Sequence, residues 1–261
     1  MLIDTHCHLD FPDFDRDRDQ VLINAASCGV KALINVGASF ESSRYSAQLA
    51  ASHENVFATV GIHPHEAKNY SSDLRLELKK IIDTNKKIVA VGEVGLDYFR
   101  NLSPASVQEE VFEIFMELAV DVRLPLVIHS RGAHGRTLEL LKTNPRVKNA
   151  GVVFHCFSGE LKELKECLDS GYYVSFTGNI TYPKSIHAQE VVRFVPLERM
   201  FLETDAPFLA PGNRRGERNA PAYLVDTARE IAMIKGEPLE KICSQTTANA
   251  IKFFKLPIVQ E

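Results

Sequence analysis

The sequence opens with a pair of histidines in a pattern that suits metal binding. His6 and His8 flank Cys7 at the end of a short apolar segment. Side chains two residues apart in a strand point to the same face, so both imidazoles face one side and Cys7 faces the other. Imidazole is the commonest protein metal ligand, so this pair indicates a metal site. We expect Cys7 to be a small buried residue rather than a ligand.

More imidazole and carboxylate groups follow the ends of other apolar segments. A ligand set of this kind, without thiolate, suits divalent ions such as Zn²⁺, Mn²⁺, Ni²⁺ or Mg²⁺. Six ligands exceed the three that one catalytic zinc ion needs, which indicates two ions that share a carboxylate. The predicted metal ligands are His6, His8, Glu93, His129, His155 and Asp205.

Taken singly, these residues allow other interpretations. A lone histidine at a strand end is more often structural, and Glu93 or Asp205 could be the buried partner of an arginine. Glu203 shares a face with Asp205, where it either orients a histidine or a water molecule or pairs with a basic residue. Asp4 shares a face with His6 but lies deeper, and we place it outside the site.

Other polar and aromatic residues near the segment ends are candidates for substrate contacts. His63 and Arg131 are predicted to bind an anionic substrate, and arginine matches phosphate with two parallel hydrogen bonds. For His65 and Arg100, the choice between substrate binding and a purely structural role stays open. The arginines at 214, 215 and 218 are more typical of solvated surface charge. Loop aromatics usually only pack, but bases could stack on some of Phe11, Tyr98, Phe99, Phe157 and Phe208.

The elements that must position these residues alternate along the chain. Strands are predicted at 2–6, 32–37, 56–61, 88–93, 126–129, 152–155, 172–176 and 200–204. Helices are predicted at about 15–29, 41–53, 73–85, 104–123, 135–144, 159–170, 187–194, 221–235 and 238–253, the fourth with Ser103 as N-cap.

This alternation predicts an α/β fold, a TIM-type (β/α)8 barrel with extra C-terminal helices, and a doubly wound open sheet is the alternative. We expect one domain over residues 1–261. In such a barrel the carboxyl ends of the strands meet on one face, where barrel enzymes place their chemistry.

Composition limits the other possibilities. Hydrophobic residues make up 45% and charged residues 25% of the chain, as in globular proteins, and the net charge is -4. No global positive field therefore attracts nucleic acid or anionic lipid. No apolar run approaches the roughly 18 residues of a membrane span, and no secretory signal is visible. With five scattered cysteines, we expect a cytoplasmic protein, and we expect a monomer.

Six segments together resemble the TatD family of metal-dependent deoxyribonucleases, within the amidohydrolase-like barrels. They are residues 4–10 (DTHCHLD), 61–65 (GIHPH), 92–98 (GEVGLDY), 128–131 (IHSR), 155–159 (HCFSG) and 202–207 (LETDAP). The match runs in the family's order from residue 2 to about Asn249. The HxH motif alone is a weak indication of this family, whereas the six segments together are specific for it.

The resemblance implies two metal ions and hydrolysis of DNA phosphodiester bonds, often from a 3′ end, with Mg²⁺ commonly the ion. One ion would be held by His6, His8, Glu93 and Asp205, and the second by Glu93, His129 and His155. We expect catalytic roles for Asp205, which orients the water or accepts its proton, for the shared Glu93 and for Glu203.

The chain departs from the family pattern at Gly132, where the family usually has an acidic residue. Glu217 and Ala220 stand where a basic and an acidic residue are expected. None of these positions is a predicted ligand, so they could alter substrate preference.

Two other functions stay open. One is hydrolysis of a cyclic amide, lactone or other carbonyl substrate by the same centre. A bridging lysine would favour that reaction, whereas Glu93 fills the place here. The other is a metal-binding barrel without catalytic activity.

Overall fold

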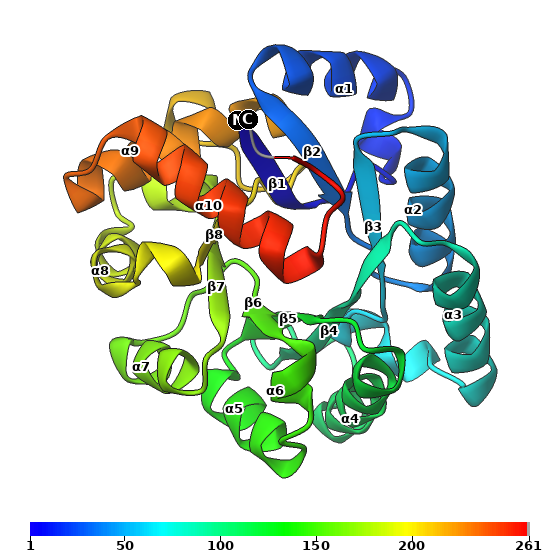
Figure 1. Cartoon of the computed structure of the whole chain (residues 1–261). Helices are drawn as coiled ribbons and strands as arrows, with labels where there is room; N and C mark the ends of the chain where they lie inside the picture. Colours follow the sequence, from blue (N-terminus) through cyan, green and yellow to red (C-terminus); the bar gives the residue numbers. More distant parts are fainter. Residues whose placement is uncertain (260–261) are drawn as a thin grey trace. The chain divides into compact units, whose positions relative to one another are not determined.

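A computed structural model describes residues 1–259 (Figure 1). Eight parallel strands follow one another in sheet order as they do in the chain, which confirms the predicted number. They are β1 (Leu2–Cys7), β2 (Val30–Asn35), β3 (Val56–Val60), β4 (Ile88–Asp97), β5 (Leu126–Arg131), β6 (Val152–Phe154), β7 (Tyr173–Phe176) and β8 (Met200–Leu202).

Helices alternate with these strands, and all nine predicted helices are present. The helices are α1 (Arg18–Ser27), α2 (Phe40–Ser52), α3 (Ser72–Thr84), α4 (Ala105–Val122), α5 (His134–Thr143), α6 (Val147–Ala150), α7 (Leu161–Asp169), α8 (Ile186–Phe194), α9 (Leu224–Lys235) and α10 (Leu239–Phe254). The single turn of α6 was not predicted, because four residues show no helical periodicity. Within residues 1–259, no helix combines the length and the apolar character that crossing a bilayer requires.

The predicted N-cap of α4 is wrong. Pro104, with extended backbone angles, occupies the N-cap position and the helix begins at Ala105. The Ser103 hydroxyl instead donates a hydrogen bond to the carbonyl of His65, 2.8 Å away. Ser103 therefore anchors the loop that carries His63 and His65.

The chain forms two compact units, which are described separately. The first unit contains residues 1–35 and 174 onward, and the second contains residues 36–173. The prediction of one domain over residues 1–261 stays a prediction.

In the first unit, the end of β1 is hydrogen-bonded to the segment that follows β8. The His8 amide donates to the Ala206 carbonyl (2.7 Å), and the Asp205 amide donates to the His6 carbonyl (2.9 Å). Helix α10 packs against β1 and β8 (Figure 1), where Phe254 contacts Phe201 with ring centroids 5.6 Å apart. Two segments about 200 residues apart in sequence thus lie side by side.

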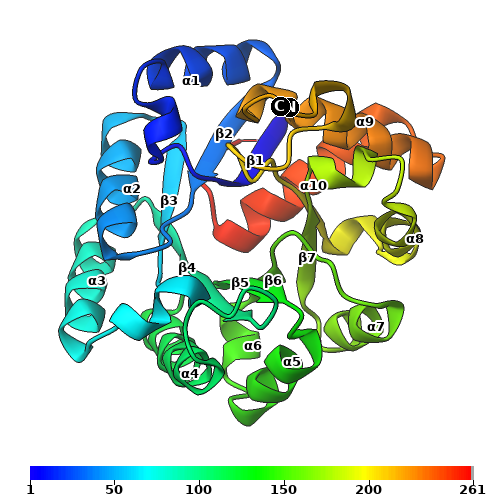
Figure 2. The ribbon, with the colours of Figure 1, turned by 180° about the vertical axis from the view of Figure 1, so that it is seen from behind.

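In the second unit, β4 is longer than predicted. It continues past Glu93 to Asp97 because Gly95 pairs with His129 of β5. Gly95 has a φ of 138°, and a β-carbon there would collide with the His129 carbonyl oxygen. Glycine therefore permits the close approach of the two strands. Helix α2 packs against β3 and α4 against β4 (Figure 2).

Candidate metal centre

The first unit gathers a group of imidazole and carboxylate atoms at the end of β1. His6 and His8 are buried, and their Nε2 atoms lie 3.1 Å apart. Asp205 Oδ1 lies 3.7 Å from the first of these atoms and 3.5 Å from the second. The predicted same-face histidine pair is therefore observed, and Asp205 lies beside it.

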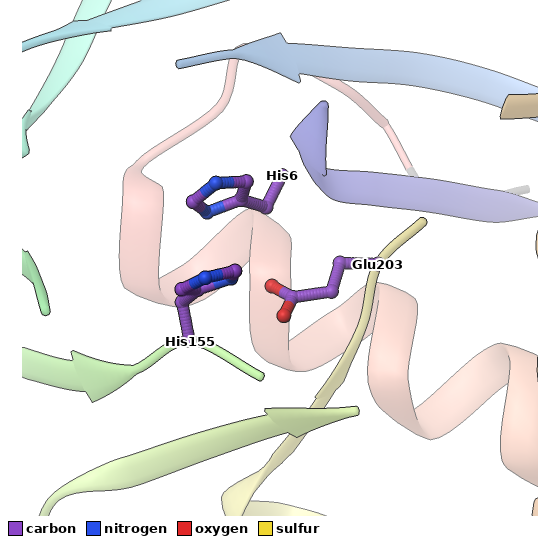
Figure 3. Close-up of side chains that lie close together, drawn as sticks. All are labelled: His6, His155 and Glu203. Atoms are coloured by element: carbon purple, nitrogen blue, oxygen red, sulfur yellow. The ribbon is translucent and has the colours of Figure 1, made fainter. Parts of the chain in front are cut away.

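Glu203 joins this group from the segment after β8. Its carboxylate and a ring nitrogen of His6 lie within 4.8 Å of each other, and the Glu203 side chain is buried. Figure 3 shows these two side chains, together with His155, which belongs to the second unit and follows β6. Glu203 is thus close enough to orient His6 or a water molecule beside it.

Asp4 holds the segment that carries Glu203 and Asp205. Its Oδ1 accepts a hydrogen bond from the Thr204 amide (3.0 Å), and its Oδ2 accepts one from the Thr204 hydroxyl (2.6 Å). Burial raises the pKa of Asp4 to about 7. Asp4 therefore supports the backbone of the group from beneath, which agrees with its exclusion from the predicted ligands.

Cys7 lies between the two histidines and points elsewhere, as expected. It is fully buried, and its thiol lies 3.5 Å from the Ile34 carbonyl in the neighbouring strand. Burial raises the pKa of this thiol well above its usual value, which disfavours the thiolate that metal binding needs.

The second unit gathers another group around Glu93. One oxygen, Glu93 Oε1, lies 2.8 Å from His129 Nδ1, 3.3 Å from His155 Nε2 and 3.6 Å from His63 Nε2. Glu93 is only 3% exposed. The three predicted ligands of this unit therefore lie together. His63, predicted to contact substrate, lies in the same group.

One further residue of this group, Asp97, was missed from the sequence, and it contacts His65, whose role the sequence left open. Asp97 Oδ2 lies 2.8 Å from His65 Nε2 and 3.3 Å from His129 Nε2, and Asp97 is fully buried. The sequence does carry a signal for Asp97. Glu93, Gly95 and Asp97 alternate along β4, so they share one face of the strand.

The Asp97 contacts set the charge of this group. Burial alone would raise the pKa of Asp97, but hydrogen bonds with His129, the Arg100 amide and His65 hold it well below its usual value. Burial likewise lowers the pKa of His129, but hydrogen bonds to Asp97 and Glu93 outweigh it and raise that pKa overall. Asp97 is therefore ionised at neutral pH and fixes the orientation of the His129 ring.

Arg131 ends β5 two residues after His129. Its guanidinium lies 4.3 Å from the centre of the exposed Phe99 ring. Stacking on an aromatic face leaves the planar N–H groups of arginine able to meet an anion. The predicted substrate contact is thus an exposed cation.

Both groups suit a divalent metal ion. Four ligands in a tetrahedron with bonds of 2.0–2.1 Å lie about 3.4 Å from one another. In the first group, the two ring nitrogens and the carboxylate oxygen are separated pairwise by 3.1, 3.5 and 3.7 Å. In the second group, Glu93 Oε1 lies 2.8, 3.3 and 3.6 Å from the three ring nitrogens. The imidazole nitrogens suit Zn²⁺, and the carboxylate oxygens suit Mg²⁺ or Mn²⁺.

Comparison with known proteins places this chain in a family. Residues 3–255 match the family model described as TatD related DNase. A Bacillus subtilis (strain 168) protein named as the uncharacterized metal-dependent hydrolase YabD is 34% identical, with 98% of this chain and 100% of the relative covered. The 3′-5′ ssDNA/RNA exonuclease TatD of Citrobacter rodentium (strain ICC168) is 33% identical, with 98% and 99% covered.

A solved structure agrees with this result. The crystal structure of YJJV, a TatD homologue from Escherichia coli K12, matches with a TM-score of 0.93 at 31% identity, and 98% of each chain is covered. Together with the order of the eight parallel strands, this match confirms the predicted (β/α)8 barrel. The chain therefore belongs to the TatD family of metal-dependent hydrolases.

Proposed function

We propose that this protein is a metal-dependent deoxyribonuclease that hydrolyses DNA phosphodiester bonds from the 3′ end of single-stranded or frayed DNA. The observation that carries the proposal is that imidazoles and carboxylates gather within each unit, at the end of β1 and after β8 in the first and at the ends of β4 and β5 and after β6 in the second. The relatives named as 3′-5′ ssDNA/RNA exonucleases support a nucleic-acid substrate.

We assign two divalent ions to these residues, with Mg²⁺ favoured and Zn²⁺, Mn²⁺ or Ni²⁺ as alternatives. His6, His8, Asp205 and Glu93 would hold one ion, and Glu93, His129 and His155 the other. The assignment rests on the donor chemistry of each group and on the family resemblance. When bound, such ions lower the pKa of water and stabilise negative charge on phosphate oxygens.

The carboxylates of the first unit have different exposures, which suit different roles. The Asp205 side chain is 14% exposed, so water can reach it, whereas Glu203 is buried. In the proposal, Asp205 accepts the proton of the attacking water, and Glu203 orients His6 or that water. Glu93 would serve as a ligand of both ions.

Two side chains of the second unit would bind the phosphate of the substrate. Arg131 presents an exposed guanidinium at the end of β5, and His63 lies beside Glu93. A cationic fork matches two phosphate oxygens. Such local contacts are needed because the chain as a whole carries a net charge of -4.

The free cysteines favour a reducing compartment. None of the five forms a disulfide in the described residues, and two of them are buried. We therefore propose a cytoplasmic location.

Metal analysis followed by a cleavage assay tests the proposal. The purified protein is analysed for bound metals and then incubated with each metal and single-stranded DNA labelled at the 5′ end. We expect progressive shortening from the 3′ end that EDTA abolishes. The His6→Ala, His8→Ala variant should lose both metal and cleavage, whereas His187→Ala, which removes an exposed histidine of α8, should retain both.

Several results would contradict the proposal. Equal cleavage by the double variant would show that a contaminant is responsible. Metal binding without cleavage of DNA, but with hydrolysis of a lactone or cyclic amide, would establish the carbonyl reaction instead. Metal binding without any hydrolysis would favour a barrel without catalytic activity.

A further inference from the structure

We infer that Phe11 and Phe208 form a stacking site for the unpaired terminal base of a single-stranded nucleic acid. This inference rests on the proposed function, since it names the part of the substrate that the first unit would recognise. Both rings belong to that unit, one just after β1 and the other after β8.

The two rings form a corner beside a candidate metal ligand. Their centroids lie 5.6 Å apart, and their planes meet at 84°. The Phe11 ring lies 5.1 Å from the His8 ring, and the Phe208 ring lies 6.4 Å from it. A base that stacks on Phe208 would meet Phe11 edge to face, an arrangement that aromatic rings favour. Its phosphate would then be directed toward the group formed by His8 and Asp205.

The Phe208 ring is exposed although its backbone is firmly held. Phe208 is 47% exposed. The Phe208 amide donates to the Asp205 carbonyl (2.8 Å), and its carbonyl accepts a hydrogen bond from the side-chain amide of the buried Asn219 (2.6 Å). A rigid ring on an ordered segment loses little freedom when a ligand stacks on it, so more of the stacking energy contributes to binding.

The charge of the chain makes a stacking contact useful. With a net charge of -4, the protein has no general attraction for a polyanion. Stacking on aromatic side chains binds any base, because every base has a π face, and it requires a base that is unpaired. The corner would therefore favour single-stranded ends without preference for sequence.

Binding and cleavage are measured with one pair of oligonucleotides. Both are short single strands labelled at the 5′ end, and they differ only in whether the 3′-terminal nucleotide carries a base or is abasic. The affinities are measured by fluorescence anisotropy with the whole chain, once in EDTA and once with Ca²⁺ in place of EDTA. Cleavage is then measured with Mg²⁺ and Mn²⁺.

We expect the wild-type protein to bind the strand with a terminal base about tenfold more tightly than the abasic strand. Phe208→Ala should abolish this difference, and Phe208→Trp should preserve it. Phe194→Ala is the matched control. Phe194 is 62% exposed at the end of α8, before β8 begins, and its loss should leave the ratio unchanged.

Equal affinity of the wild-type protein for the two strands would overturn the inference. So would an equal loss for both strands in Phe208→Ala, because that result describes a structural role for the ring. The proposed function is decided separately. Base-dependent binding without cleavage would refute the nuclease and leave the stacking site. Cleavage with equal affinity for the two strands would refute the stacking site and leave the nuclease.

Discussion

At the scale of single residues, the two groups show how neighbouring acids acquire different tasks. Asp205 is partly exposed beside two histidines, Glu203 and Glu93 are buried, and Asp97 is buried behind His129. In the proposed function, their exposure and contacts, rather than their chemical type, distinguish the proton acceptor from the carboxylates that orient another residue.

The substitution Asp205→Asn tests the proposed role of Asp205 as the acceptor of the proton from water. The substitution keeps the shape of the side chain but removes its basicity. We expect turnover to fall by roughly 100- to 10,000-fold, as for the loss of a general base. Metal content is measured on the same sample by mass spectrometry. Near-normal turnover with intact metal content would exclude this role for Asp205.

Asp97→Asn tests whether Asp97 orients His129. An asparagine can hold only part of the contacts that Asp97 makes with His65 and His129. We expect metal affinity to weaken by about 10- to 100-fold, while the protein stays folded. Titration with a competing chelator measures the affinity, and Asp121→Asn, which alters an exposed carboxylate, is the control. Unchanged affinity would leave Asp97 with a purely structural role.

At the scale of elements, the extended part of β4 aligns Glu93 and Asp97 with His129. This part of the strand forms because Gly95 allows close pairing with β5. The paired strands then set the distances of the Glu93 and Asp97 carboxylates from the His129 imidazole. The loop before α3 is anchored by Ser103, which donates a hydrogen bond to the backbone carbonyl of His65, and the His65 ring contacts Asp97.

Gly95→Ala should therefore damage both stability and metal binding. The added methyl group would collide with the His129 carbonyl oxygen, and the alanine would have to keep the positive φ of Gly95. We expect a loss of about 2–3 kcal/mol in the free energy of unfolding, measured with urea. Gly216→Ala is the control, since its φ is also positive but no atom lies within 4 Å of the new carbon. Its cost should be only about 1 kcal/mol. Equal costs would show that backbone strain alone is responsible.

At the scale of the whole molecule, ion pairs make stability depend on pH. Hydrogen bonds from Arg136 and Tyr98 lower the pKa of Glu109, and a hydrogen bond from Arg218 lowers the pKa of Asp17. A carboxylate whose pKa is lower in the folded state stabilises the protein above its unfolded pKa. That contribution disappears as the pH falls through the lower, folded value.

We therefore expect the urea midpoint to decrease as the pH falls below about 4.5, the ordinary value for a glutamate side chain. The Glu109→Gln variant should be less stable than the wild type at pH 7, and the difference should shrink at pH 3. The effect is modest because these side chains are partly exposed and water screens them. A difference that grows with acidification would contradict this account.

The sequence by itself determined the strand order and the candidate ligands. Apolar runs of strand length mark β1 to β8, and the alternation of side chains along a strand places His6 and His8 on one face. These are local properties, so each can be read from a few neighbouring residues.

Only the tertiary structure decided which distant residues support the ligands. The contact of Asp97 with His129 depends on the pairing of β4 with β5, and the contact of Asp4 with Thr204 joins residues 200 positions apart. The exposure of Phe208 depends on a backbone held by Asn219. Such contacts arise from packing between segments, which leaves no periodic pattern in the sequence.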